Sequence, residues 1–182
     1  MSRRPTALRA ISGTLPALVV LALASGIVGC APEPKVEKQV SDREPGPYLV
    51  LNLTERRVYL KDDDPKTPDE SFLVAIGQKR WETPTGKFRV NEMVKNPDWV
   101  QFDWANPEKT IRRIPPGPNN PLGERWIGFA SSKHGWEVGF HGTAKTSVLG
   151  QAVSHGCVRM ANKDVIKVFE KVQLGTTVIV EP

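Results

Sequence analysis

The residues best suited to chemistry lie close together near the C-terminal end of the chain. A histidine stands sixteen residues upstream of a cysteine, and the segment between and just beyond them holds a second histidine and an arginine. A cysteine is a strong nucleophile only as a thiolate, and a histidine can take up the thiol proton near neutral pH. These residues therefore indicate a cysteine enzyme that transfers acyl groups. The residues singled out are His141, Gly142, Ser154, His155, Gly156, Cys157 and Arg159.

The neighbours of the cysteine add to this prediction without settling it. Gly156 lets a substrate approach the backbone closely, and the backbone N–H groups of Gly156 and Cys157 are candidates for binding a developing oxyanion. On the residues alone, a buried inert thiol at Cys157 and a structural histidine at His141 stay open as alternatives. His155 is equally compatible with lining a substrate groove and with bracing the loop of the nucleophile.

The segment 154–160 reads SHGCVRM and resembles the signature of the L,D-transpeptidase catalytic domain, the YkuD type. His141-Gly142 stands sixteen residues before the cysteine, as that signature asks. The blocks 83–88 (TPTGKF) and 120–123 (NPLG) fit the same resemblance, which extends over nearly all of residues 47–182. Several ordered blocks at this spacing are a more specific signal than the short motif alone.

The resemblance implies a role for each of these positions. Cys157 corresponds to the nucleophile, His141 to the general base, and Gly142 to the residue whose carbonyl orients that histidine. The positions expected to contact substrate are Ser154, His155, Gly156 and Arg159. At Arg159 a guanidinium is suited to holding a substrate carboxylate through two hydrogen bonds.

The resemblance also implies a reaction. The thiolate attacks a stem tetrapeptide of peptidoglycan, the terminal D-Ala leaves, and a thioester acyl-enzyme remains. An amine acceptor then yields a 3–3 cross-link or attaches an envelope protein, whereas water makes the enzyme a carboxypeptidase or hydrolase. No metal or organic cofactor is implied, and carbapenems are expected to acylate the cysteine.

Two alternatives from other classes of protein remain. One is a zinc protein whose ligands would be the three histidines and the cysteine, although no CxxC or HExxH pattern supports it. The other is a lipoprotein that binds the cell wall without catalysis. The zinc ligands in the first alternative would be His134, His141, His155 and Cys157.

The pattern of the chain predicts a mainly β domain, a sandwich or partly closed barrel with one or two short helices. Strand-like runs are expected at 48–53, 57–60, 71–77, 87–94, 126–131, 136–140 and 176–180. A helix capped by Asn162 is expected to run to about Val172, with Val165, Ile166 and Phe169 on its apolar face. Residues 95–124 contain six prolines and fit no period, so a long functional loop or lid is expected there.

The N-terminal segment resembles the signal peptide of a bacterial lipoprotein. Residues 1–29 carry three arginines ahead of an apolar run that ends in IVGC, so lipid attachment at Cys30 is expected. Residues 30–46 hold three prolines and many charges, which predicts a flexible tether to residues 47–182. We therefore expect a periplasmic or envelope protein anchored to a membrane, the outer one in a Gram-negative host.

Charge excludes one class of partner. The chain has a formal net charge of +5, and residues 1–29 carry three of its 25 basic residues and no acid. Residues 30–182 are therefore nearly neutral overall, so nothing indicates nucleic-acid binding. The sequence indicates no oligomeric state.

Overall fold

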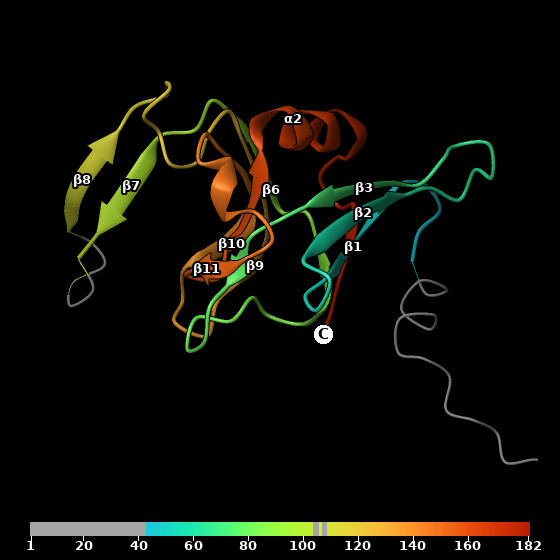
Figure 1. The fold of residues 1–182 in the computed structure, drawn as a ribbon, viewed down its shortest axis with the longest axis horizontal. Coiled ribbons are helices and arrows are strands. Elements are labelled where there is room, and N and C mark those ends of the chain that lie inside the picture. The colour runs from blue at the N-terminus through green and yellow to red at the C-terminus, as the bar shows by residue number, and fades with distance from the viewer. Residues whose placement is uncertain (1–42, 104–105, 107–108) are drawn as a thin grey trace, which may run out of the picture. The chain divides into compact units, whose positions relative to one another are not determined.

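The structure is a computed structural model that describes residues 43–182 except 104–105 and 107–108. The predicted signal peptide and Cys30 lie outside the described residues. The described strands form a five-stranded sheet, a four-stranded sheet and two two-stranded sheets, and Figure 1 shows helix α2 beside them. This confirms the predicted mainly β fold with a short helix.

The first sheet has five strands in the order β3-β2-β1-β13-β5. The C-terminal strand β13 lies parallel to β1 and antiparallel to β5, so both ends of the domain meet in the middle of this sheet. The two central strands are buried on both faces and are rich in Val, Leu and Ile, as expected for strands covered on each side. The bounds are β1 Tyr48–Asn52, β2 Arg57–Lys61, β3 Glu70–Leu73, β5 Gly86–Arg89 and β13 Thr177–Glu181.

The second sheet has four strands in the order β12-β10-β9-β6 and carries the predicted chemistry. Buried side chains of both sheets and of α2 form one hydrophobic cluster that includes Leu49, Val58, Phe140 and Val165. This cluster fixes the second sheet against the first. The bounds are β6 Glu92–Lys95, β9 Arg125–Ser131, β10 Glu137–Thr143 and β12 Val158–Ala161.

Two runs expected to be single strands each divide between sheets. The run 71–77 ends as β3 and resumes as β4 (Ile76–Gly77), which pairs in parallel with β11 (Ala152–Ser154). The run 87–94 leaves the five-stranded sheet after β5 and enters the four-stranded sheet as β6. Backbone bonds from Val90 to Thr176 and from Asn91 to Gly128 mark the crossing. Continuous apolar patterning cannot reveal such a change of sheet.

Helix α2 (Asn162–Lys171) packs beside the four-stranded sheet. The expectation that Asn162 caps this helix is wrong, because Ala161 holds the cap position and no side chain bonds there. Asn162 is the first helical residue, and its side-chain oxygen accepts a hydrogen bond from the Glu124 backbone N–H at 3.4 Å. The predicted apolar face is largely confirmed: Val165 and Val172 are buried and Phe169 packs against the core. Val168 is also fully buried, whereas Ile166 is only half-buried.

The stretch 95–124 is not the strandless loop that its prolines suggested. It contains a hairpin of β7 (Trp99–Phe102) and β8 (Thr110–Ile114), whose strands pair antiparallel with each other. Figure 1 shows this hairpin apart from the two larger sheets. Phe102 and Ile111 are more than half exposed on it. A short 3₁₀ turn, η1 (Thr146–Val148), completes the described elements.

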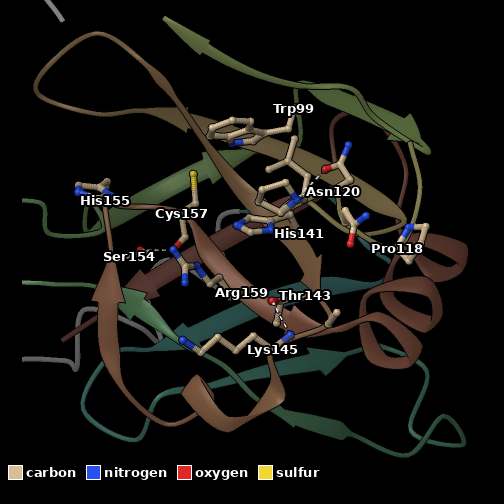
Figure 2. A pocket seen from close by; sticks show the side chains of 14 residues that line it. Trp99, Pro118, Asn120, His141, Thr143, Lys145, Ser154, His155, Cys157 and Arg159 are labelled. Carbon is tan, nitrogen blue, oxygen red and sulfur yellow. Dashed lines mark hydrogen bonds between the residues drawn. The ribbon is translucent and has the colours of Figure 1, made fainter. Parts of the chain in front are cut away.

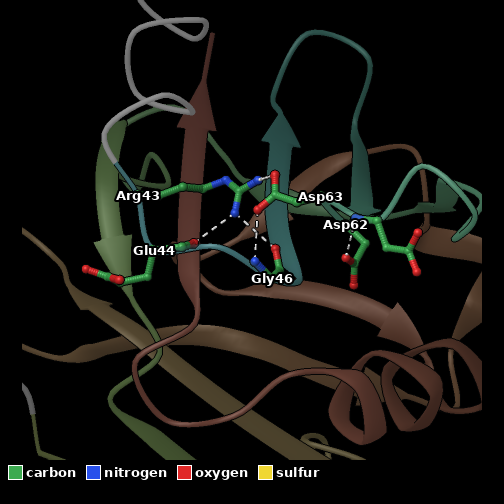
Figure 3. Close-up of polar contacts among 6 residues, drawn as sticks. Arg43, Glu44, Gly46, Asp62 and Asp63 are labelled. Atoms are coloured by element: carbon green, nitrogen blue, oxygen red, sulfur yellow. Dashed lines mark hydrogen bonds and ion pairs between the residues drawn. The ribbon is translucent and has the colours of Figure 1, made fainter.

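The first described residues are bonded to the domain, although their composition placed them in the tether. The Arg43 guanidinium lies 3.5 Å from the ring centroid of Tyr48, pairs with Asp63, and donates to the Gly46 carbonyl at 3.0 Å. Figure 3 shows this cluster closing around Arg43, whose side chain is 2% exposed. A cation held by a carboxylate, a carbonyl and an aromatic face fixes these first described residues to the domain.

Candidate active site

Neighbouring strands bring the predicted base and nucleophile together. Strands β10 and β12 are parallel, and their register places His141 directly opposite Arg159. Cys157 is the residue immediately before β12. Parallel neighbours require a long connection, and here the connection carries η1 and β11 and returns to deliver the cysteine beside β10. The sixteen-residue spacing between His141 and Cys157 thus spans this crossover, which runs from residue 144 to residue 157.

The loop of the nucleophile is held by the serine of the motif. The Ser154 hydroxyl donates to the Cys157 carbonyl at 2.5 Å and accepts from the Gly156 N–H at 3.1 Å. Gly156 has a φ of 114°, a backbone conformation that side chains disfavour. Ser154 is 1% exposed, so its geometry is that of a residue that shapes the loop. The Gly156 N–H is occupied by this bond, which removes it from the candidate oxyanion donors.

A threonine far away in sequence secures the same loop. The hydroxyl of buried Thr83 donates to the Gly156 carbonyl at 2.8 Å and accepts from the Gly77 N–H at 3.0 Å. The sequence placed 83–88 among the blocks of the resemblance but indicated no role for Thr83 near the cysteine. The block TPTG in the signature was the available signal, and the structure shows why it is there.

His141, Arg159 and Cys157 line one cavity of about 400 Å³. Figure 2 shows the Cys157 sulfur and the His141 ring entering this cavity, with Trp99 of the hairpin above them in that view. Ser154 and His155 line it as well, whereas Gly142 and Gly156 lie behind its wall. The full lining is Trp99, Pro118, Asn119, Asn120, Pro121, Leu122, His141, Thr143, Ala144, Lys145, Ser154, His155, Cys157 and Arg159.

His141 is held as a neutral base. Its Nδ1 lies 2.8 Å from the Gly142 carbonyl, and since a carbonyl only accepts, Nδ1 carries the proton. The other ring nitrogen is then the acceptor. The side chain is 5% exposed, and this burial lowers the pKa of His141 to about 4. The positive charge of Arg159 also lowers this pKa, whereas the hydrogen bond to the Gly142 carbonyl raises it.

Cys157 is held mainly as a thiol. Burial raises the pKa of the half-buried thiol, while the Gly139 N–H and the Arg159 charge oppose that rise. The sulfur lies 3.7 Å from the Glu137 carbonyl. Gly139 stands at the irregularity between β9 and β10, where the strand register shifts. A bulge beside a reactive group re-aims backbone donors, and here one N–H is turned toward the sulfur.

Two cations face the cavity. Among the described residues no carboxylate pairs with Arg159 or with Lys145. Figure 2 shows the Lys145 ammonium and the Arg159 guanidinium at the same end of the cavity, below Cys157 in that view. Sequence reasoning found Arg159 but missed Lys145, which follows the histidine by four residues and belongs to no predicted block.

Close packing explains the glycine after His141. A Cβ on Gly142 would lie 2.0 Å from the Asn162 side-chain oxygen, so no larger residue fits. Asn120, from the NPLG block, is also buried and donates to the carbonyls of Pro97 and Ile114 at 2.8 and 3.1 Å. These contacts tie the base of the hairpin to the wall of the cavity.

The described residues do not gather the ligand set of the zinc alternative. Within residues 43–182, leaving out 104–105 and 107–108, no three His, Cys, Asp or Glu side chains come together in a way that could hold a metal ion. His134 is exposed and stacks on Trp136, with ring centroids 4.9 Å apart.

Comparison with known proteins agrees with this geometry. Residues 46–180 match the YkuD family, the L,D-transpeptidase catalytic domain. The chain is 34% identical over 136 residues to YqjB of Bacillus subtilis, which is assigned to the L,D-transpeptidases, and the match covers 74% of this chain and 70% of that protein. The chain therefore belongs to the L,D-transpeptidase catalytic domain family, a family of cysteine transpeptidases of the cell envelope.

Solved structures show the same fold. The catalytic domain of the Enterococcus faecium L,D-transpeptidase aligns with a TM-score of 0.54 at 20% identity, over 76% of this chain and 98% of that one. L,D-transpeptidase 3 of Mycobacterium tuberculosis, solved with a faropenem-derived adduct, aligns with a TM-score of 0.56 at 18% identity, over 76% of this chain. The present chain spans 61% of the mycobacterial one.

Proposed function

We propose that this protein is a peptidoglycan L,D-transpeptidase that works through a thioester on Cys157. The observation that carries the proposal is the single cavity shared by Cys157, the neutral imidazole of His141 and the two cations without carboxylate partners among the described residues. The thiol supplies the nucleophile and the imidazole accepts its proton. The cations suit a donor that ends in a carboxylate, as a stem tetrapeptide does.

The first half of the reaction forms the acyl-enzyme. The Cys157 proton passes to the unprotonated nitrogen of His141 as the sulfur bonds to the carbonyl carbon before the terminal D-Ala. The backbone N–H of Cys157, with no hydrogen bond to another described residue, is the donor available for the oxyanion. The C–N bond then breaks, His141 returns the proton to the leaving amine, and D-Ala departs with its carboxylate near Arg159 and Lys145.

The second half consumes the thioester. An acceptor amine attacks the acyl carbon, gives up a proton to His141, and the C–S bond breaks to restore the thiol. Transfer to a second stem gives a 3–3 cross-link, and transfer to a lysine attaches a protein. Attack by water gives a tripeptide. The acceptor that reaches the thioester thus decides between transferase and carboxypeptidase.

Incubation with defined disaccharide tetrapeptides, followed by mass analysis, tests the proposal. We expect cross-linked dimers from the wild type, none from Cys157→Ala or His141→Ala, and a covalent penem or carbapenem adduct on Cys157 that Cys157→Ser lacks. Tripeptides without dimers would assign the carboxypeptidase reaction. If folded wild-type protein forms neither product nor adduct, the proposed enzyme activity is refuted.

A lipid anchor on Cys30 is part of the proposal. The IVGC sequence before the tether supports it. Among the described residues no helix is long and apolar enough to cross a membrane. Expression in a lipoprotein-processing host, with intact mass measurement, should show loss of residues 1–29 and added acyl mass. Cys30→Ser should leave the membrane fraction, and an unmodified Cys30 in the wild type would contradict the anchor.

A further inference from the structure

Four aromatic side chains form a cluster at one end of the catalytic cavity. The Trp81 ring lies 4.6 Å from His134, 5.1 Å from Trp136 and 5.1 Å from His155, measured between ring centroids. His134 and Trp136 are nearly parallel, at 17°. We call these four residues the aromatic platform. They come from three separate segments of the chain, so the fold assembles the platform rather than the local sequence.

The aromatic platform is open to solvent and continuous with the cavity. His134 and His155 are exposed, and Trp81 and Trp136 are half-buried. His155 also lines the cavity, and the Trp136 indole N–H donates to the His155 carbonyl at 3.3 Å. Figure 2 shows His155 at one end of the cavity and Pro118 at the other, with Cys157 between them. A donor substrate that extends past Cys157 toward His155 would reach the rings of the aromatic platform.

Charged groups border the platform. Glu82 pairs with Lys133 at 3.0 Å, and its backbone bonds together with that ammonium lower the pKa of the exposed carboxyl to about 2. Rigid aromatic faces beside polar groups suit a ligand with apolar faces and polar edges. A pyranose ring has this shape, with C–H groups on its faces and hydroxyl or N-acetyl groups around its edge. A short aliphatic peptide offers no such faces.

We propose that the aromatic platform binds the N-acetylated glycan strand to which the stem peptide is attached. This inference rests on the proposed function. Three stem residues separate the scissile bond from the sugar and span about 10 Å. The Cα atoms of Cys157 and His155 are two residues apart, at most about 7 Å, and the Trp81 and His155 ring centroids are 5.1 Å apart. The platform therefore lies within the reach of a sugar attached to the stem.

A binding measurement tests the platform without relying on catalysis. The probe is a soluble tetramer of N-acetylglucosamine, titrated into the full chain carrying Cys157→Ala and followed by calorimetry. We expect binding that weakens about tenfold in Trp81→Ala and several-fold in His134→Ala, whose exposed ring can be removed without disturbing the core. The control is Leu174→Ala, an apolar side chain that is 63% exposed and lies outside the platform, and this variant should bind like its parent.

A kinetic comparison separates the glycan from the peptide as the ligand. We expect the wild type to show a lower KM for a disaccharide tetrapeptide than for the same tetrapeptide without sugar, and His134→Ala to reduce that ratio toward one. Absence of tetramer binding, or an equal rise of both KM values in His134→Ala, would overturn the platform as a glycan site. If the chain binds the tetramer but forms no product, the platform is supported as a glycan site and only the proposed function is refuted.

Discussion

Burial drives the two reacting side chains toward their neutral forms. It lowers the pKa of His141 to about 4 and raises the pKa of Cys157, so the resting pair is a thiol and a neutral imidazole. The nucleophile is thus generated during attack on the substrate rather than stored as an ion pair. A thiol in this state also resists oxidation in an oxidising compartment.

Alkylation of Cys157 by iodoacetamide should therefore be slow at neutral pH. In a Cys30→Ser chain we expect the rate at pH 7 to fall below that of the urea-unfolded chain and to climb as the pH exceeds 9, because only the thiolate reacts. Mass spectrometry against time measures the rate. A rate that is already at its plateau below pH 8 would instead indicate a preformed ion pair.

His141 should make the fold less stable in mild acid. The unfolded chain protonates this histidine near its ordinary pKa of 6.5, whereas the folded chain does so only near 4. Between these values the unfolded state binds more protons, so stability is lost as pH falls, by about 3 kcal/mol over the whole range. Urea unfolding at pH 7 and pH 4.5 measures it. His141→Gln should flatten the difference, and an unchanged difference in that variant would assign it to other groups.

Strand pairing and hydrogen bonds from segments distant in the sequence hold the loop that carries Cys157. The segment 75–77 pairs with β11 on one side of the nucleophile and with Arg159 on the other, and Thr83 reaches the peptide between them. The loop of the cysteine is therefore bracketed at both ends by a strand that lies eighty residues earlier in the chain. Rigid brackets of this kind pre-organise a reactive side chain.

Thr83→Val should loosen that loop. It leaves the Gly77 N–H and the Gly156 carbonyl without their buried partner, at a cost of about 1 to 3 kcal/mol, and acylation by a penem should slow as well. Thermal unfolding and time-resolved mass spectrometry measure the two effects. Thr83→Ser keeps the hydroxyl and serves as the control. Equal behaviour of the valine and serine variants would show that the hydroxyl is not what holds the loop.

The sequence allowed the strands and the helix to be placed approximately, because alternation and apolar runs report burial. It did not reveal that the runs 71–77 and 87–94 change sheets, since a change of partner leaves the pattern of apolar residues intact. It also concealed the hairpin within 95–124, whose strands are mostly exposed and so lack a periodic signal. Asn162 was misjudged because its side chain bonds outward to Glu124, which no local rule anticipates.

The candidate site was predictable to the extent that a short motif carried it. Cys157, His141 and Arg159 stand in or beside recognisable blocks, and the structure brings them to one cavity. Lys145 and the aromatic platform were not recognised, because only tertiary folding brings Lys145 to the cavity and the rings of the platform to one another. For the same reason the role of Thr83 appeared only once its partner Gly156 was placed beside it.

At the scale of the whole molecule, Arg43 ties the first described residues to the domain. Arg43→Ala should remove the contact with Tyr48 and the pairing with Asp63, lower the free energy of unfolding by about 1 to 2 kcal/mol, and expose residues 43–46 to protease. Chemical unfolding and mapping of the first cleavage sites measure this. Arg43→Lys keeps the positive charge but loses the planar guanidinium, so its free energy of unfolding should lie between those of the wild type and Arg43→Ala. Wild-type stability in Arg43→Ala would show the cluster to be incidental.

The adjacency of β10 and β12 has a consequence for how readily this enzyme can diversify. The predicted general base lies on β10 and the predicted nucleophile directly precedes β12, while residues 144–149 lead from β10 toward β11 and carry Lys145. This connecting segment can be lengthened or changed in composition without moving the Cys157 sulfur or the His141 ring. Directed evolution for new donors should begin by randomising it, leaving the strands that flank it untouched.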